Sequence, residues 1–340
     1  MLETSTDAAR DTATVPARAA RSRRRSGLRR VGRGLLLVLI LLAVAGLAGA
    51  GVEAVVARSD DDRYPPPGRL VTVTGNDLHL NCTGSGAPTV VLEAGLGEPS
   101  LSWADVQSSL DDGLRVCSYD RAGLGWSGVA DDGAWTGEAA AADLAGLLGA
   151  AGEQGPYVLV AHSVGALVSR EFRQAHPEEV RAMVLLDPTD AEAVRTAGVP
   201  TVAVAERRIQ GLLARTGVLR WSGKWLVPAV VGDQPPQALL SRLPAAYHPG
   251  AIGASLRELW GTVASAEHLL RQEDSSWGDL PVTVVSASSA SQSQRDAHAG
   301  LAARSSRGEH VSAESGGHYV HYVDPQWVVG LVREAAAAAG

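Results

Sequence analysis

Hydrophobic and polar residues follow two alternating patterns from residue 70 onward. Short runs rich in β-branched residues predict strands at 70–74, 77–82, 89–93, 114–119, 157–161, 180–186, 281–286 and 310–313. Longer stretches with helical spacing predict helices at 99–110, 138–150, 164–175, 294–305 and 325–338. Because strands alternate with helices, the pattern indicates an α/β domain over 70–340, with a mostly parallel sheet covered by helices on both faces.

This alternation stops between the sixth and seventh predicted strands. The intervening residues, about 190–278, have a helical pattern, several prolines and no clear strand, and we predict that they form an inserted helical cap. Half of the eight tryptophans of the chain fall in this segment: Trp221, Trp225, Trp260 and Trp277. They indicate either an apolar lid over a binding pocket or the core of the cap itself.

An apolar segment precedes the α/β domain. Eighteen residues without charge run from Leu35 to Val52, and about 20 apolar residues span the hydrocarbon core of a bilayer. We therefore predict a transmembrane helix over 34–57, followed by a charged and proline-rich linker over 58–69. The small residues at 48–50 also suit a signal peptidase, so a cleaved signal peptide is the alternative.

The charge of the chain is distributed unevenly. Residues 1–33 contain nine arginines and three acidic residues, a net charge of +6. Because the whole chain has a net charge of −7, the remaining residues carry a net charge of −13. Arginines before an apolar helix indicate a cytoplasmic N-terminus, here a disordered basic tail, with the α/β domain outside the cell membrane. In the alternative the domain is secreted. The acidic domain argues against a nucleic acid as partner, because binding to phosphates requires a basic surface.

Motifs for metals and cofactors are weak. The two cysteines and nine histidines form no C-x-x-C or H-E-x-x-H pattern, so we predict no metal site. Gly123–Gly128 matches G-x-G-x-x-G, but a dinucleotide site needs a helix to begin at once, and none is predicted there. Gly217–Lys224 has the wrong spacing for a phosphate-binding loop. The sequence predicts no cofactor.

A candidate nucleophile lies between a predicted strand and a predicted helix. The sequence A-H-S-V-G places Ser163 on a strand-to-helix turn between small residues, which projects its hydroxyl. The alternative is a serine that only caps the helix. A serine nucleophile needs a base, and His318 follows the last predicted strand in a glycine-containing loop. His321 is the rival base, and His162 is interpreted as structural or exposed.

The remaining groups for such chemistry are an acid and two amide donors. Asp187 ends a predicted strand at the carboxyl edge of the sheet, and Asp296 is the alternative acid. A tetrahedral oxyanion needs two N–H donors. Val164 follows the serine and supplies one, and Leu96, between two glycines after the third strand, is the candidate for the other. An ordinary glycine-rich turn is the alternative for that loop.

Taken together, these motifs resemble the α/β-hydrolase superfamily, in particular its bacterial serine hydrolases, over about residues 70–335. The motifs are Glu93–Gly97, Ser118–Ser127, His162–Gly165 and Gly317-His318. The resemblance implies an eight-stranded sheet and the chain order nucleophile, acid, histidine. The chain departs from the pattern at Ala161, where glycine is usual, and after the seventh strand, where no carboxylate stands before Asp296.

The resemblance also implies a pairing and a function. In that fold the second strand lies antiparallel beside the fourth, which would bring Cys82 near Cys117, so a disulfide is a hypothesis. The expected function is that of a membrane-anchored serine hydrolase that cleaves an ester or related carbonyl bond through an acyl-enzyme. The expected partner is a small-molecule substrate with a hydrophobic acyl group. The alternatives are a non-catalytic ligand-binding member of the same fold and a dinucleotide enzyme.

Overall fold

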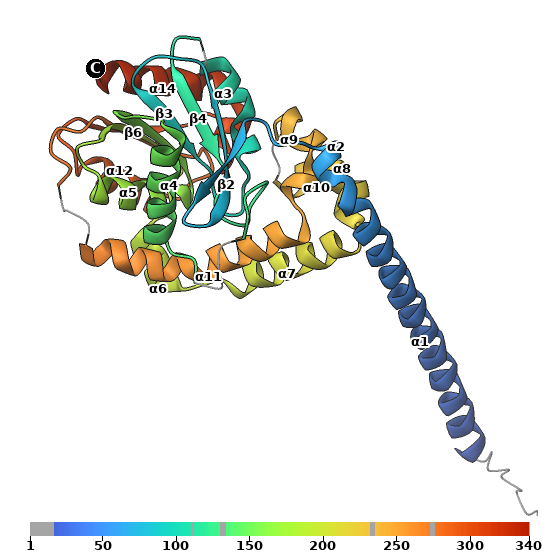
Figure 1. Ribbon diagram of the computed structural model, residues 1–340. Coiled ribbons are helices and arrows are strands. Elements are labelled where there is room, and N and C mark those ends of the chain that lie inside the picture. The colour runs from blue at the N-terminus through green and yellow to red at the C-terminus, as the bar shows by residue number, and fades with distance from the viewer. Residues whose placement is uncertain (1–16, 111, 130–133, 232–234, 273–275, 340) are drawn as a thin grey trace, which may run out of the picture. The chain divides into compact units, whose positions relative to one another are not determined.

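The computed structural model describes residues 17–110, 112–129, 134–231, 235–272 and 276–339 (Figure 1). The chain divides into two compact units, Met1–Ala48 and Gly49–Gly340. The described elements of the second unit include one large sheet, its covering helices and a helical segment inserted between two strands.

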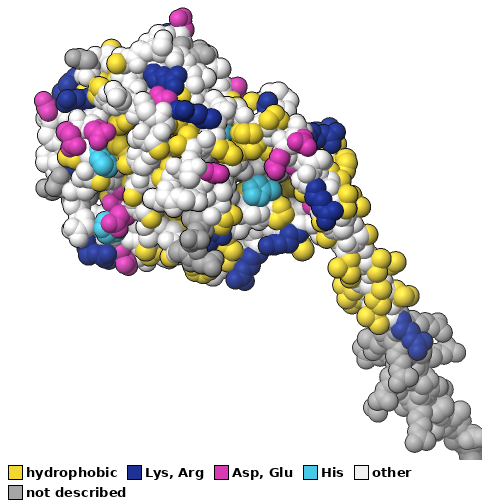
Figure 2. All heavy atoms as spheres, viewed as in Figure 1, with side chains coloured by type: hydrophobic (Ala, Val, Ile, Leu, Met, Phe, Trp, Pro, Cys, Tyr) yellow, Lys and Arg dark blue, Asp and Glu magenta, His cyan; other side chains and the backbone are white. Residues whose placement is uncertain are grey.

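The N-terminal part of the chain is helical. Helix α1 (Ala17–Val56) is followed by the short helices η1 (Ala57–Ser59) and α2 (Asp60–Arg63). Among the described residues, only Val31–Arg63 is long and apolar enough to cross a membrane, with a mean hydropathy of 2.8 in its 18-residue window. Many apolar side chains are exposed on this helix from Val31 onward (Figure 2). The first half of the expected linker, 58–69, is helical. The aspartates in the first turn of α2 stabilise that helix N-terminus.

The sheet has eight strands in the order β1-β2-β4-β3-β5-β6-β7-β8. The strands are β1 (Arg69–Val73), β2 (Asn76–Thr83), β3 (Thr89–Glu93), β4 (Arg115–Tyr119), β5 (Tyr157–His162), β6 (Val180–Leu186), β7 (Val282–Ser286) and β8 (Gly308–Ser312). Strand β2 is antiparallel to both of its neighbours, and all other pairs are parallel. The predicted mostly parallel, eight-stranded sheet is confirmed.

Helices cover both faces of this sheet. They are η2 (Ser100–Trp103), α3 (Ala104–Leu110), α4 (Gly137–Ala151), α5 (Gly165–Ala175), α12 (Gln292–Ala302), α13 (Val320–Val323) and α14 (Pro325–Ala339). Side chains alternate across strand β5: Val158 and Val160 join the apolar cluster under α3 and α14, whereas Leu159 and Ala161 join the cluster under α4 and α5. The central strands are therefore apolar on both sides, as a parallel sheet with two helical layers requires.

The described residues between β6 and β7 form only helices. These are α6 (Ala191–Ala197), α7 (Thr201–Arg215), α8 (Val218–Val231), α9 (Gln237–Ser241), α10 (Leu243–Ala246) and α11 (Pro249–Gln272), and α7 and α11 lie side by side (Figure 1). We call α6–α11 the cap.

The tryptophans of the predicted cap do not form its core. The side chains of Trp221, Trp225 and Trp260 are largely exposed, so the interpretation of these three as cap core is wrong. Trp277 is buried, but it packs against the core of the sheet beside β7 rather than within the cap. An aromatic-rich helical pattern cannot show which side of a helix its rings occupy, because that depends on what the helix packs against.

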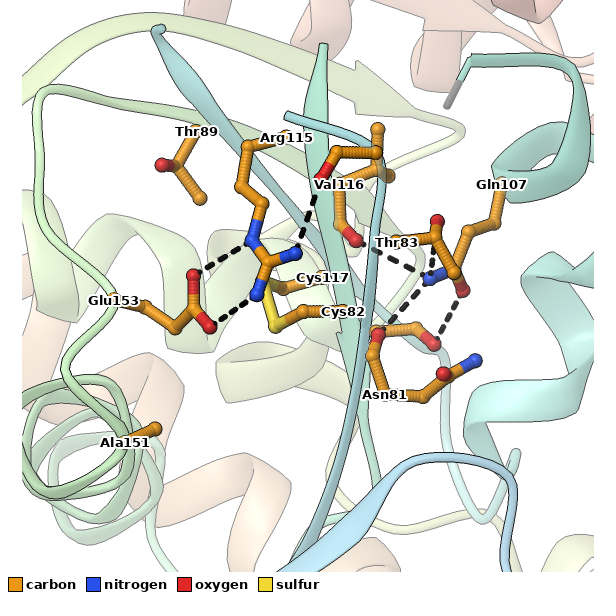
Figure 3. Close-up of a disulfide and its surroundings, with 12 residues drawn as sticks. Asn81, Cys82, Thr83, Thr89, Gln107, Arg115, Val116, Cys117, Ala151 and Glu153 are labelled. Carbon is orange, nitrogen blue, oxygen red and sulfur yellow. Dashed lines mark hydrogen bonds and ion pairs between the residues drawn. A yellow bond between two sulfur atoms is a disulfide. The ribbon is translucent and has the colours of Figure 1, made fainter. Parts of the chain in front are cut away.

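A disulfide joins the two antiparallel strands near one edge of the sheet. Cys82 of β2 and Cys117 of β4 are direct partners in the strand register and are bonded to each other (Figure 3). Residues next to the two cysteines make hydrogen bonds to other parts of the domain (Figure 3). Arg115 makes two hydrogen bonds to Glu153, and the Gln107 side-chain amide donates to the carbonyl of Asn81. These hydrogen bonds connect the strands that carry the disulfide to α3 and to the loop after α4.

Replacement of both cysteines should lower stability measurably. The bond closes a loop with a sequence separation of 35 residues. We expect Cys82→Ala/Cys117→Ala to lower the free energy of unfolding by about 2–4 kcal/mol, because the unfolded chain regains the entropy of that loop. Denaturant unfolding of the variant and of the oxidised parent measures the difference. Equal midpoints would show that the bond contributes nothing to stability.

Candidate active site

Ser163 occupies a sharp turn between strand β5 and helix α5. Its φ is +50°, a value that L-residues rarely adopt, and its N–H donates to the carbonyl of Leu186 at 3.0 Å. Gly165 permits this turn to lie against the neighbouring strand, because a Cβ there would lie 2.5 Å from the carbonyl oxygen of Ala94. Ala161, the departure from the usual glycine, is fully buried in the core. The strained turn directs the serine hydroxyl toward the carboxyl edge of the sheet.

His318 lies within hydrogen-bonding distance of this hydroxyl. It lies between β8 and α13, its Nε2 is 2.9 Å from Ser163 Oγ, and its Nδ1 is 2.6 Å from Asp187 Oδ2. An ionised carboxylate can only accept, so Nδ1–H must donate to Asp187. Nε2 is then the free acceptor for the serine proton. This is the tautomer that a general base needs.

Asp187 is held in place by the backbone as well as by the histidine. It directly follows strand β6 with a φ of +42°, and its Oδ1 accepts from the Ala287 N–H at 3.0 Å. Burial alone would raise the pKa of this carboxyl, but the hydrogen bonds from His318 and Ala287 outweigh burial and hold the pKa below its usual value. The carboxylate is therefore ionised at neutral pH and able to stabilise an imidazolium.

The two rival residues lie elsewhere. Asp296 is exposed on α12 and accepts from its helix neighbour Gln292 at 2.7 Å. His321 is fully buried, and neither of its ring nitrogens has a hydrogen-bond partner among the described residues. Burial lowers the pKa of His321 well below its usual value, so the ring is neutral. The structure thus brings Ser163 and His318 together with Asp187 and not with either rival.

A buried ion pair between His162 and Glu98 contacts the backbone of His318, and the sequence does not predict it. His162 Nδ1 lies 3.2 Å from Glu98, and its Nε2 donates to the backbone carbonyl of His318 at 2.9 Å. Burial would raise the pKa of Glu98, but the charge and the hydrogen bond of His162 more than offset this effect, and the pKa falls to about 2. The pair fixes the backbone of His318. Because 64 residues separate Glu98 from His162, no local pattern indicates their contact.

Glu98, His162 and His321 are also the described residues nearest to this site that could hold a metal ion. Their ligand atoms lie within 4.8 Å of one another. However, both nitrogens of His162 already have partners, and all three side chains are shielded from solvent. We interpret the cluster as an ion pair, and the sequence-based expectation of no metal site stays a prediction.

The loop that carries Leu96 is held from both sides. Arg121 donates to the carbonyls of Ala94 and Gly95, each at 2.6 Å. Gly97, with a φ of +66°, donates its N–H to Glu258 Oε2 of cap helix α11 at 2.7 Å. The Leu96 N–H has no protein acceptor among the described residues. An unengaged amide in a fixed loop is what an oxyanion donor requires.

Val164, the second predicted donor, follows Ser163 at the start of α5. It is the N-cap residue of that helix, with α-helical φ and ψ, and it is buried. Its N–H likewise has no protein acceptor in the part of the chain that the structure describes. The amides at a helix N-terminus carry partial positive charge, so this donor is suited to a developing negative charge.

An apolar cavity of about 190 Å³ lies between this edge of the sheet and the cap. Leu96 and Gly97 line part of its wall, together with Tyr319, the residue after His318. Side chains from several cap helices line the rest, among them Leu213, Leu219, Leu226, Val227, Leu243 and Ile252. The cavity therefore adjoins the candidate oxyanion loop and is suited to an apolar group.

Comparisons with known proteins agree with this architecture. Residues 88–220 match the family described as alpha/beta hydrolase fold. A thermophilic esterase from Thermogutta terrifontis superimposes with a TM-score of 0.59 at 20% identity, covering 80% of this chain and 98% of the esterase. An enol-lactonase from Burkholderia xenovorans gives 0.58 at 19% identity, covering 79% of this chain and all of the lactonase.

Sequence relatives match shorter stretches. The uncharacterized protein YqjL of Bacillus subtilis is 35% identical over 121 residues, 35% of this chain and 47% of that protein. Lipase LipV of Mycobacterium tuberculosis is 36% identical over 116 residues, 34% of this chain and 43% of the lipase. The chain thus spans less than half the length of these curated relatives. The chain therefore has the α/β-hydrolase fold, and residues 88–220 match that family.

Proposed function

We propose that the protein is a serine hydrolase that cleaves an ester or related carbonyl bond through an acyl-enzyme. The observation that carries this proposal is the hydrogen-bonded chain from Ser163 Oγ through His318 to Asp187, at 2.9 and 2.6 Å. His318 Nε2 takes the serine proton as Oγ attacks the carbonyl carbon, and the Leu96 and Val164 amides bind the oxyanion. The protonated His318 then gives the proton to the leaving alcohol.

Deacylation repeats these steps with water. His318 Nε2 deprotonates a water molecule, whose oxygen attacks the acyl carbon, and the proton then returns to Ser163 Oγ as the acid leaves. Asp187 keeps the imidazole in one tautomer and stabilises the imidazolium in both halves of the reaction. The apolar cavity beside Leu96 supports a hydrophobic acyl or alcohol group as substrate, and relatives named esterase and lipase agree with this class.

We further propose that the enzyme is a single-pass protein of the cell membrane, with a cytoplasmic N-terminus and an extracytoplasmic hydrolase domain. The apolar helix from Val31 onward and the arginines before it support this topology. The Cys82–Cys117 disulfide supports it independently, because such bonds persist in oxidising compartments outside the cytosol.

Labelling with a fluorophosphonate probe tests the serine mechanism. The probe bonds covalently to an activated serine, so we expect the full-length protein to be labelled and Ser163→Ala to remain unlabelled. A folded parent protein that takes no label would favour the non-catalytic ligand-binding alternative. The dinucleotide alternative has little support, because the next described helix after Gly123–Gly128 is α4, which starts at Gly137.

The identity of the acid is tested by a matched pair of substitutions. We expect Asp187→Asn to lower kcat about 10³–10⁴-fold, because an amide no longer holds the imidazole in the required tautomer. The control Asp296→Asn should keep parental kcat, since Asp296 is exposed and bonded only to Gln292. Steady-state rates on a short-chain nitrophenyl ester measure both. A large loss in Asp296→Asn with little in Asp187→Asn would reverse the assignment.

A further inference from the structure

Cap helix α8 exposes a row of large apolar side chains. Val218, Trp221 and Trp225 follow the spacing i, i+3, i+7 and so share one face of the helix. Trp221 is 66% exposed and Trp225 64%, and Lys224 lies over the Trp225 ring at 4.4 Å. Large rings of this kind are normally buried or at an interface. We call Val218, Trp221 and Trp225 the α8 outer face.

Helix α8 is tied to the chain segment that follows the apolar run. The guanidinium of Arg220 donates to both oxygens of Glu53, at 2.7 and 2.8 Å, and to both oxygens of Asp60, at 2.6 and 2.8 Å. Both the arginine and its partners are largely shielded from solvent. Glu53 directly follows Val52, the last residue of the uncharged run. The helix with the α8 outer face is therefore held where the chain would leave a membrane.

The other side of α8 lines the apolar cavity. Leu219, Gly223, Leu226 and Val227 contribute to the cavity wall, and Leu96 of the candidate oxyanion loop lines the same cavity. One helix thus separates the cavity from the α8 outer face. A substrate that enters beside α8 would reach the reactive edge without crossing the sheet.

We propose that the α8 outer face lies in the interfacial layer of the bilayer and that the substrate is a lipid-soluble acyl ester which enters the cavity from the membrane. The inference depends on the proposed hydrolase function and membrane anchor. Tryptophan concentrates at membrane interfaces, where the ring is half solvated, and lysine stems extend toward the headgroups. Helices with an apolar face and basic residues bind that layer, and Lys224 and the exposed Arg215 provide the charge.

Fluorescence quenching tests the docking without reference to activity. The full-length protein is reconstituted in phosphatidylcholine–phosphatidylglycerol vesicles with brominated acyl chains, which quench only tryptophans in contact with lipid. We expect the quenched signal to fall at least about twofold in Trp221→Ser/Trp225→Ser. The control is Trp260→Ser, which removes a comparably exposed ring from α11 and should leave the quenched signal unchanged. Equal quenching in the parent and the double variant would overturn the proposal, as would a dimer that buries α8 instead.

Kinetics test the substrate class. For a long-chain ester presented in vesicles, the double variant should show a KM at least about tenfold higher, whereas kcat on a soluble short-chain ester stays within about twofold of the parent. Equal losses on both substrates, or none on either, would overturn the proposed route of entry. If the parent hydrolyses neither ester, the proposed hydrolase function fails, and the quenching experiment still decides the docking.

Discussion

Ser163→Ala and His318→Ala are each expected to lower kcat on a short-chain ester by about 10⁴–10⁶-fold, and the double variant should be no slower than either single one. Both side chains act in the same step, because the imidazole contributes to catalysis by taking the proton from the serine hydroxyl, which lies 2.9 Å away. Once one partner is absent, the other has nothing left to contribute. Steady-state and single-turnover rates of the three variants measure this non-additivity.

His321→Phe is the matched control for this experiment. His321 is the rival base, it is buried without a hydrogen-bond partner among the described residues, and burial keeps it neutral. An apolar ring of similar shape should therefore leave kcat within about tenfold of the parent. If His321→Phe lost as much activity as His318→Ala, the assignment of the base would be wrong. Circular dichroism of each variant verifies that the fold is intact.

Arg121→Met is expected to have the largest effect on stability. The guanidinium bonds Glu258 at 2.7 and 3.0 Å and Glu93 at 2.5 Å, and all three side chains are almost fully buried. Removal of the cation leaves two carboxylates buried without a counter-charge. Breaking a buried ion pair in this way costs about 3–5 kcal/mol, because desolvation of the remaining charge is no longer compensated.

Denaturant unfolding of the purified variant measures this loss. Arg195→Gln is the control, since Arg195 pairs with Glu192 on the exposed surface of α6 and should leave the unfolding midpoint unchanged. A loss in Arg121→Met no larger than in the control would show that the network is dispensable. Arg121 also holds the carbonyls of Ala94 and Gly95, so the surviving folded protein should bind the oxyanion less well.

The arginine network also explains part of the motif Ser118–Ser127. The sequence marked this segment only by its likeness to a superfamily. In the structure, Asp120 accepts from the Ser100 and Trp126 amides and pairs with His79 at 2.7 Å, while Arg121 donates to the carbonyl of Ala94 in the candidate oxyanion loop. Apart from Trp126, these partners lie outside the motif, 20 or more residues away in the chain. No local spacing could have assigned their roles.

Local pattern located the main elements accurately. Strands β3 and β6 begin and end where the β-branched runs do. Both strands are buried on two faces, so each appears in the sequence as one continuous apolar run with clear ends. The helix predicted at 294–305 begins earlier, at Gln292, because the Ser291 side chain and Gln294 form a capping box. The first half of the expected linker is helical, and its aspartates suit the N-terminus of that short helix.

The sequence by itself determined the α/β class, the strand-to-helix turn at Ser163 and the short list of groups that could act with it. These follow from hydrophobic periodicity and from turn chemistry, which are local properties. Only the tertiary structure brings Asp187 rather than Asp296 to His318, pairs Glu98 with His162, and leaves the tryptophans of α8 exposed. Each of these depends on which distant segments pack together in the folded chain. Hydrogen-bond distances and burial are set by that packing and not by any single stretch of residues.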